Sequence, residues 1–215
     1  MLLIFDWDGT LADSELHIVT ALRAAAEELG WQLQSHRDCA SVIGLGLREA
    51  ACTLYAGLSE PDIDHYCRSY RDHFRNLANT TQPLRLFEQA EATLFELQRR
   101  GHALAVATGK SRQGLDRALQ ECGLAELFCA TRTADESQSK PHPAMLRDIL
   151  SSTTTAVDGA AMIGDTSFDM QMASALGMPR VAANYGVHSA ADLEQFDPVW
   201  SIDRIDQLLD WPGLA

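Results

Sequence analysis

Two aspartates stand two positions apart in FDWDGTLADS, residues 5–14, beside a glycine and a threonine. Four apolar residues, 2–5, run into the first aspartate, and a short apolar run that leads to a glycine is typical of a buried strand followed by a turn. Asp6 and Asp8 are therefore expected where a strand gives way to a loop. Carboxylates this close oppose each other's ionisation unless a cation compensates for their charge. The pair could supply a nucleophile, a proton carrier or metal ligands; an Asp-Gly turn with incidental acids is the alternative.

Two further polar clusters follow apolar runs later in the chain. Residues 103–107 lead into Thr108, Gly109 and Lys110, and residues 160–163 lead into Gly164 and Asp165. In a doubly wound α/β sheet, ligands bind beyond the carboxyl ends of the strands, near the point where the strand order reverses. All three clusters fall at such strand ends, which indicates that they form one site.

The elements that would position these clusters alternate along the chain. Apolar residues at helical spacing predict helices over residues 87–100, 112–122, 143–150 and 168–176. Short apolar runs predict strands over residues 2–5, 103–107, 127–130, 160–163 and 180–183, the last of these being the final clear strand. Alternating strands and helices predict an α/β fold, a doubly wound parallel sheet covered by helices on both faces.

An all-helical insertion is expected behind the first strand. Helical patterns dominate from residue 14 to about residue 81, and Asp13 or Ser14 is placed to cap the first helix. A polar linker is expected where the insertion ends, formed by Asn79, Thr80, Thr81 and Pro83. We therefore predict a core made of residues 1–13 and 82–215, and a helical cap domain made of residues 14–81.

Composition narrows the functional classes. The net charge of −13 argues against a nucleic-acid partner, because phosphate backbones attract the opposite charge. No apolar run approaches the ~20 residues of a membrane span, and the N-terminus lacks the pattern of a secretory signal. The five cysteines form no close pair and are odd in number, as expected of buried free thiols in a reducing compartment. We expect a cytoplasmic protein without a membrane partner, and a monomer by default.

Four motifs in order make the chain resemble a phosphatase of the haloacid dehalogenase superfamily, of the branch whose helical cap is inserted after the first strand. DWDGT at residues 6–10 matches the first motif, and Thr108 within ATGK matches the second. Lys140 within SKPHP matches the third, and GDTSFD, with Asp165 and Asp169, matches the fourth. Together with the order of helices and strands, the resemblance covers nearly the whole chain.

Two details refine this resemblance. The tail GVHSAADLEQFDPVWSIDRIDQLL resembles the phosphoglycolate-phosphatase-like group of the branch. The segment Phe87-Glu88-Gln89-Ala90 departs from relatives, which commonly have Pro-Gly there, so the shape of the linker returning from the cap stays open.

The resemblance implies a Mg²⁺-dependent phosphoric monoester hydrolase that acts through an aspartyl-phosphate. Asp6 would be the nucleophile, since a carboxylate is ionised at pH 7 without a partner base. Asp8 would give a proton to the departing alcohol and later take one from water. Mg²⁺ would be bound by Asp6, by Asp165 and by the backbone carbonyl of Asp8. The expected partner is a small phosphorylated metabolite, with phosphoglycolate as the first guess.

Further residues would bind the substrate. Backbone amides after Asp6, through Gly9, would form a small anion-binding nest, and Thr10 and Gly109 would also bind the substrate. Thr108 offers a hydroxyl and Lys140 a point charge for the phosphoryl oxygens.

Supporting roles are also implied, each with an alternative. Asp169 would orient Lys140 or a metal-bound water, or merely favour the dipole of its helix. Only Lys110 and Lys140 of the 17 basic residues are lysines; Lys110 is a supporting site residue or a surface charge. Arg48, in the cap, would bind an anionic substrate tail or be a solvated helix charge.

Other classes of protein share parts of this pattern. A dehalogenase of this superfamily needs the nucleophile but not the second aspartate, so Asp8 favours phosphate esters. The predicted cap contains no lysine, which opposes a hydrolase that forms a Schiff base with a cap lysine. A phosphomutase shares all four motifs and stays open. A receiver-like signalling domain would also combine aspartates, a threonine and a lysine around Mg²⁺, but its phosphorylated aspartate would not follow the first strand. Candidates at every catalytic position oppose an idle binding protein.

Overall fold

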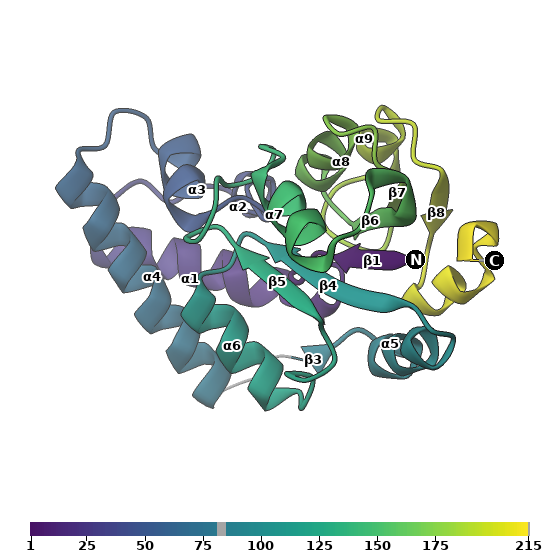
Figure 1. Cartoon of the computed structure of the whole chain (residues 1–215). Helices are drawn as coiled ribbons and strands as arrows, with labels where there is room; N and C mark the ends of the chain where they lie inside the picture. Colours follow the sequence, from purple (N-terminus) through teal and green to yellow (C-terminus); the bar gives the residue numbers. More distant parts are fainter. Residues whose placement is uncertain (81–84, 215) are drawn as a thin grey trace.

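The computed structural model describes residues 1–80 and 85–214, and the side chains of residues 1–77 and 85–214. Within the described residues, one sheet of six parallel strands has the order β5-β4-β1-β6-β7-β8 (Figure 1). The strands are β1 Leu2–Phe5, β4 Ala103–Thr108, β5 Ala130–Thr133, β6 Ala160–Gly164, β7 Arg180–Ala183 and β8 Trp200–Ile202. Because β1 has β4 on one side and β6 on the other, the sheet is doubly wound, and the predicted fold class is confirmed.

The register of these strands places the polar clusters at one edge. Phe5 is opposite Val106 of β4 and Ile163 of β6. The residues that follow on each strand, including Asp6 and Asp165, therefore leave the sheet side by side. The amide of Asp6 continues the ladder by donating to the Ile163 carbonyl at 2.9 Å.

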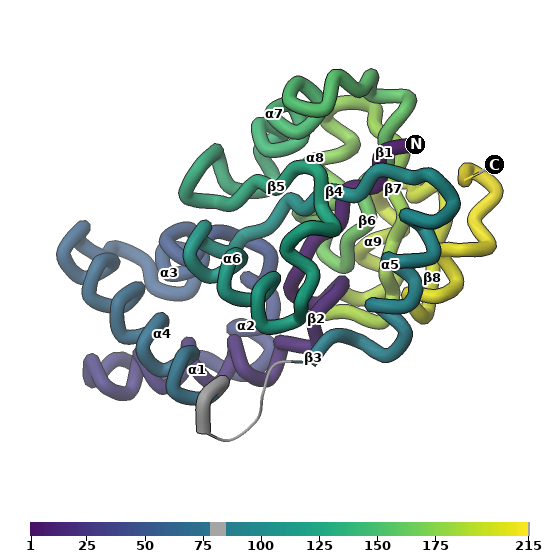
Figure 2. The backbone as a smooth tube through the Cα atoms, turned by 60° about the horizontal axis from the view of Figure 1, so that its bottom comes forward, coloured from purple at the N-terminus to yellow at the C-terminus, as the bar shows by residue number. Residues whose placement is uncertain are grey.

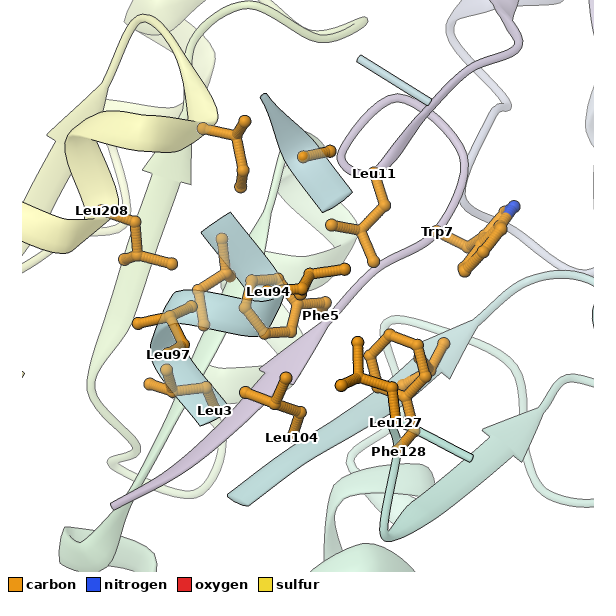
Figure 3. Close-up of a cluster of buried hydrophobic side chains, with 14 of the residues drawn as sticks. Leu3, Phe5, Trp7, Leu11, Leu94, Leu97, Leu104, Leu127, Phe128 and Leu208 are labelled. Atoms are coloured by element: carbon orange, nitrogen blue, oxygen red, sulfur yellow. The ribbon is translucent and has the colours of Figure 1, made fainter. Parts of the chain in front are cut away.

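Helices cover both faces because side chains alternate along β1. Leu3 and Phe5 point into one apolar cluster and Leu2 and Ile4 into another. The first cluster is covered by α5 Ala90–Arg99, α6 Arg112–Glu121 and the 3₁₀ helix η2 Ile205–Asp210 (Figure 3). The second is covered by α7 Ala144–Thr153 and α8 Ser167–Ser174. A short helix, α9 Ala190–Glu194, packs beside α8, and the 3₁₀ turns η1 and η3 span Val157–Gly159 and Pro212–Leu214.

Four helices between β1 and β4 form a separate group at one side of the sheet, which we call the cap (Figures 1 and 2). They are α1 Glu15–Glu28, α2 His36–Ala40, α3 Leu47–Leu54 and α4 Glu60–Thr80. An apolar cluster of their own holds them together, built around α1 and α4 and including the stacked rings of Trp31 and Tyr66 at 5.3 Å. The chain leaves and re-enters the core through the short antiparallel strands β2 Ala12–Asp13 and β3 Arg85–Leu86.

Some predicted elements were wrong, for identifiable reasons. The predicted strand over residues 127–130 is shifted, because Leu127 and Phe128 are apolar to fill the first cluster and not to form β5. The predicted helix over residues 87–100 begins only at Ala90, because the chain first pairs with β2 and the Phe87 amide donates to the Leu11 carbonyl at 2.9 Å. A further strand, β8, follows the one predicted as last.

The end of the cap also differs from the prediction. The backbone of α4 continues through Thr80, so Asn79 and Thr80 are helical and not part of a polar linker. Thr81, Pro83 and the predicted division between residues 81 and 82 lie outside the described residues, and the division stays a prediction. Of the five free cysteines, Cys52 and Cys129 are exposed, contrary to the expectation of buried thiols. No helix in the described part of the chain is both long and apolar enough to span a membrane.

Candidate active site

Three buried carboxylates meet at the carboxyl ends of β1 and β6. Asp6 follows β1, Asp165 follows β6, and Asp169 lies in the first turn of α8. One carboxylate oxygen from each of the three lies within 4.8 Å of the other two, and each residue is at most 1% exposed. Such a cluster cannot be fully ionised in a dry interior unless cations balance it.

Lys140 supplies one of those cations. Its Nζ lies 2.8 Å from Asp6 Oδ1 and 2.6 Å from Asp169 Oδ1, and the whole side chain is buried. Burial opposes the charge of this ammonium, but the charges of Asp169 and Asp6 outweigh burial and raise the pKa of Lys140. Lys140 is therefore protonated at neutral pH, and Asp169 orients it.

One ammonium does not balance three carboxylates, and the carboxyl pKa values reflect this. Burial raises the pKa of Asp6 although Lys140 opposes the rise. Burial and the charge of Asp169 raise the pKa of Asp165 to about 7, although two hydrogen bonds favour its ionised form. These bonds come from Thr10 Oγ1 to Asp165 Oδ1 at 2.6 Å and from the Val187 amide to Asp165 Oδ2 at 2.9 Å. A second cation at this site would restore the balance of charge.

The oxygen atoms fit a hard divalent cation. Asp6 Oδ1 already accepts from the Trp7 amide at 2.6 Å, whereas Asp6 Oδ2 is buried without a hydrogen-bond partner among the described residues. A buried oxygen in this state is costly unless a ligand occupies it. Mg²⁺ prefers carboxylate and carbonyl oxygens, and Asp6 and Asp165 offer both charge and free lone pairs.

Two glycines make room for Asp165. A Cβ added at Gly9 would lie 2.1 Å from Asp165 Oδ2, and one at Gly186 would lie 2.2 Å from the Asp165 Cβ. Gly9 also has φ +82°, which side chains rarely adopt. The structure gives Gly9 this role in place of the expected nest, because its amide already donates to the Ala12 carbonyl at 2.9 Å. Thr10 likewise uses its hydroxyl on Asp165 and not on a free anion position.

Asp8 lies beside the carboxylate cluster with partners of its own. Lys110 Nζ is 2.9 Å from both Asp8 oxygens, and Ser14 Oγ donates to Asp8 Oδ1 at 2.7 Å. The Lys110 amide donates to Thr108 Oγ1 at 3.2 Å, and its ammonium lies 5.0 Å from the ring centre of Phe74 in the cap. The structure therefore brings Lys110 and Thr108 to the site together with Asp8.

Arg48 is not brought to the carboxylate cluster. It lies on α3, with its guanidinium in ion pairs to Glu60 and Asp64 of α4 and 45% of its side chain exposed. It lines the cavity between cap and core, but its charge is already engaged, and its role toward a substrate stays a prediction. Gly109 lines the same cavity and packs against the cap, where an added Cβ would lie 2.4 Å from the Leu45 carbonyl.

Several site residues were missed at the level of the sequence. Ser14 begins α1, but its hydroxyl makes no capping bond and instead holds Asp8. Tyr185 donates to the Thr10 carbonyl at 2.9 Å from a distant part of the chain, and nothing in the sequence signals either contact. Thr166 was detectable, because Thr-x-x-Asp is a capping box, which the structure forms between Thr166 and Asp169.

The chain can now be compared with known proteins. Residues 3–183 match the family model described as haloacid dehalogenase-like hydrolase. A relative from Dickeya dadantii, named probable phosphatase IndB, is 31% identical over 212 residues, which cover 97% of this chain and 91% of the relative. Pyrophosphatase PpaX from Bacillus cereus is 26% identical over 207 residues, which cover 96% of this chain and 93% of the relative.

Solved structures share the fold along almost the full length. A haloacid dehalogenase-like family hydrolase from Streptococcus pneumoniae has a TM-score of 0.83 and 26% identity, and the match covers 97% of this chain and 96% of that one. A predicted phosphoglycolate phosphatase from Haemophilus somnus has a TM-score of 0.84 with the same coverage, but its 24% identity supports the fold alone.

Proposed function

Because the chain belongs to the haloacid dehalogenase-like hydrolase family, and to the phosphatases of that superfamily, we propose that it hydrolyses a small phosphomonoester with Mg²⁺ through an aspartyl-phosphate on Asp6. The observation that carries the proposal is that Asp6 Oδ2 is buried without a hydrogen-bond partner among the described residues, while Asp6 Oδ1 lies 2.8 Å from Lys140 Nζ. One oxygen of Asp6 is held by protein donors, and the other is free to bind a ligand.

The metal would be held by Asp6, by Asp165 and by the backbone carbonyl of Asp8. When bound, Mg²⁺ supplies positive charge that offsets the carboxylates and polarises a phosphoryl oxygen. The carboxylate cluster and the pKa of Asp165, raised to about 7, support this assignment.

The first step forms a bond between a carboxylate oxygen of Asp6 and phosphorus while the ester P–O bond breaks. The departing alcohol oxygen takes a proton from Asp8, which Ser14 holds in place. In the second step a water molecule attacks the phosphorus and gives its proton to Asp8, which releases inorganic phosphate and restores the Asp6 carboxylate.

Cations around Asp6 would stabilise the charge on the transferred group. Lys140 is held by Asp169 with its ammonium against Asp6, where it would lie close to a phosphoryl group bound to Asp6. The Thr108 hydroxyl lies at the end of the neighbouring strand β4. Lys110 pairs with Asp8 in the structure, and an incoming phosphate dianion would compete for it. Asp8 needs to leave that ion pair in order to carry a proton.

The physiological substrate is a small phosphorylated metabolite, and phosphoglycolate is the first to test. This choice rests on the tail of the chain, which resembles the phosphoglycolate-phosphatase-like group. We place the enzyme in the cytoplasm as a monomer, in line with its free cysteines. A phosphomutase would use the same residues but would return the phosphoryl group to an organic product.

A panel of phosphorylated metabolites, with phosphoglycolate and pyrophosphate included, tests the proposal directly. Purified protein with Mg²⁺ should release inorganic phosphate steadily from at least one monoester. Isomerisation without phosphate release would indicate a mutase, and a single turnover without further release would indicate a receiver-like domain. Absence of release from every monoester would contradict the proposed function.

A further inference from the structure

The cap contacts the core through both its loop before α3 and its helix α4. The Gly46 amide donates to Ser139 Oγ at 2.7 Å, and Gly109 packs so closely against the cap loop that only a glycine fits. The Phe74 ring of α4 lies 5.0 Å from Lys110 Nζ. These contacts indicate that the cap is already seated over the strand ends.

A cavity of about 470 Å³ remains between the seated cap and the core, with Asp6 and Asp8 in its wall. This volume lies within the ~300–1,000 Å³ that is usual for sites of drug-sized ligands. The alcohol part of phosphoglycolate has only two carbon atoms and would fill a small part of it. The cavity is therefore built for a larger leaving group.

The inner wall that the cap contributes is apolar. The side chains are Ile18, Leu22, Val42, Ile43, Tyr70 and Phe74. The first four are each at most 8% exposed, and all six belong to the apolar cluster of the cap or pack against it. An apolar group that covers such a wall gains the free energy of leaving water.

The charged cap residues lie elsewhere along the cavity. Arg48, Glu49, Arg71 and Arg75 are exposed, so they form the rim and not the interior. The Arg48 guanidinium in addition forms ion pairs with Glu60 and Asp64. On the cap side, a leaving group that extends from Asp8 therefore meets apolar side chains, whereas Lys110, Gln113 and Asp135 are among the residues that line the core side.

From this arrangement we infer that the preferred substrate is a phosphomonoester whose alcohol part carries a bulky apolar group, of about the size of a ring. The inference rests on the proposed phosphatase function and specifies its substrate class. The phosphate would lie against Asp6 and Lys140, and the apolar group against Val42 and Phe74.

Benzyl phosphate, ethyl phosphate and phosphoglycolate test the inferred preference for an apolar alcohol group. All three are esters of primary alcohols, so they differ strongly in the size and polarity of the alcohol but little in how readily it leaves phosphorus. We expect kcat/KM for benzyl phosphate to exceed that for ethyl phosphate at least tenfold, which corresponds to about 1.4 kcal/mol. Benzylphosphonate, which is not hydrolysed, should inhibit competitively at least tenfold more strongly than ethylphosphonate.

Val42→Phe would narrow the cavity at its apolar wall. The advantage of benzyl over ethyl phosphate in kcat/KM should then fall at least fivefold. Val199→Phe, the same change at a residue that is 52% exposed and outside the cavity, is the matched control and should leave both values unchanged. The phosphonate comparison on the wild-type protein decides the matter if Val42→Phe does not fold.

The outcomes separate the inference from the proposed function. Phosphate release with ethyl phosphate or phosphoglycolate preferred over benzyl phosphate would overturn the inference and leave the phosphatase function standing. An equal loss for both esters in Val42→Phe would also overturn it, because the wall would then not select. If no ester releases phosphate, neither these three nor any of the metabolite panel, both the proposed function and the inference are overturned.

Discussion

The contribution of each charged residue at this site depends on the opposite charges around it. Lys140 is one of two lysines in the chain, and it lies between Asp6 and Asp169 with no exposed surface on its side chain. Most surface charges contribute less than ~1 kcal/mol to stability. A buried ammonium between two carboxylates differs in kind, because removing it leaves both carboxylates without compensation.

Lys140→Ala should therefore lower kcat/KM at least a hundredfold and lower the free energy of unfolding by about 3–5 kcal/mol. Lys140→Arg should restore little activity, because a planar guanidinium does not replace a compact ammonium in a packed site. Arg99→Ala, which breaks a surface pair with Glu96, is the control and should leave the kinetics unchanged. Steady-state kinetics with thermal unfolding would measure both effects. Wild-type kinetics in Lys140→Ala would remove this residue from the site.

Replacing each aspartate of the first motif by asparagine should remove a different catalytic function. Asp6→Asn should abolish phosphate release, because an amide is a poor nucleophile and a weaker metal ligand. Asp8→Asn keeps the backbone carbonyl but loses proton transfer, so we expect kcat to fall roughly a hundredfold or more. Single-turnover and steady-state kinetics separate the two losses. Near wild-type release by Asp6→Asn would contradict a covalent mechanism on this residue.

At the scale of elements, the described part of the return from the cap contains a strained residue just before α5. Gln89 has φ +66°, a left-handed conformation that favours glycine. It lies in the segment of residues 87–90, so a glutamine here occupies a glycine-like backbone conformation.

Gln89→Gly should relieve this strain and raise the free energy of unfolding by about 0.5–1 kcal/mol, the net of lower strain and a more flexible unfolded chain. Gln98→Gly is the matched control, because Gln98 is exposed within α5 and has helical backbone. There the same change should lower the free energy of unfolding by up to about 1 kcal/mol. Urea unfolding of the two variants would measure both values. Equal destabilisation by both would show that position 89 is not strained.

Helices and strands could be predicted where their position depends only on residues that are neighbours in the sequence. The strand that leads to Asp6 is predicted from neighbouring residues, and the structure has it. The capping box around Asp169 is detectable in the same way, although it was not predicted. The shift of β5 could not be foreseen, because Leu127 is buried in the apolar cluster on one face of the sheet and its apolar character does not indicate whether its backbone pairs with β4. The bond from Ser14 to Asp8 is local in sequence but depends on how the loop folds back.

At the scale of the whole molecule, a strongly acidic chain holds a site for an anion. The net charge of −13 opposes a phosphate dianion at long range, although salt screens exposed charges beyond roughly 8 Å at physiological ionic strength. Within the site, Lys140 and Lys110 are each already paired with carboxylates. The site holds the carboxylates of Asp6, Asp8, Asp165 and Asp169 against these two ammonium groups. Binding a phosphate dianion beside them would therefore need another cation, which is the role we propose for Mg²⁺.

Mg²⁺ should accordingly stabilise the whole protein, and not only switch on its activity. A ligand that binds only the folded state adds about 2.7 kcal/mol at a hundred times its Kd, which for a chain of this size corresponds to a rise in Tm of roughly 5–10 °C. Asp165→Asn should abolish the rise while leaving the metal-free protein at least as stable as wild type, because burial already disfavours the charge of Asp165 and raises its pKa. Thermal unfolding with and without Mg²⁺, after treatment with EDTA, measures this independently of any substrate. An unchanged Tm at millimolar Mg²⁺, or activity at full rate in EDTA, would remove the metal from the mechanism. A rise of equal size in wild type and Asp165→Asn would place the bound ion elsewhere on this acidic surface.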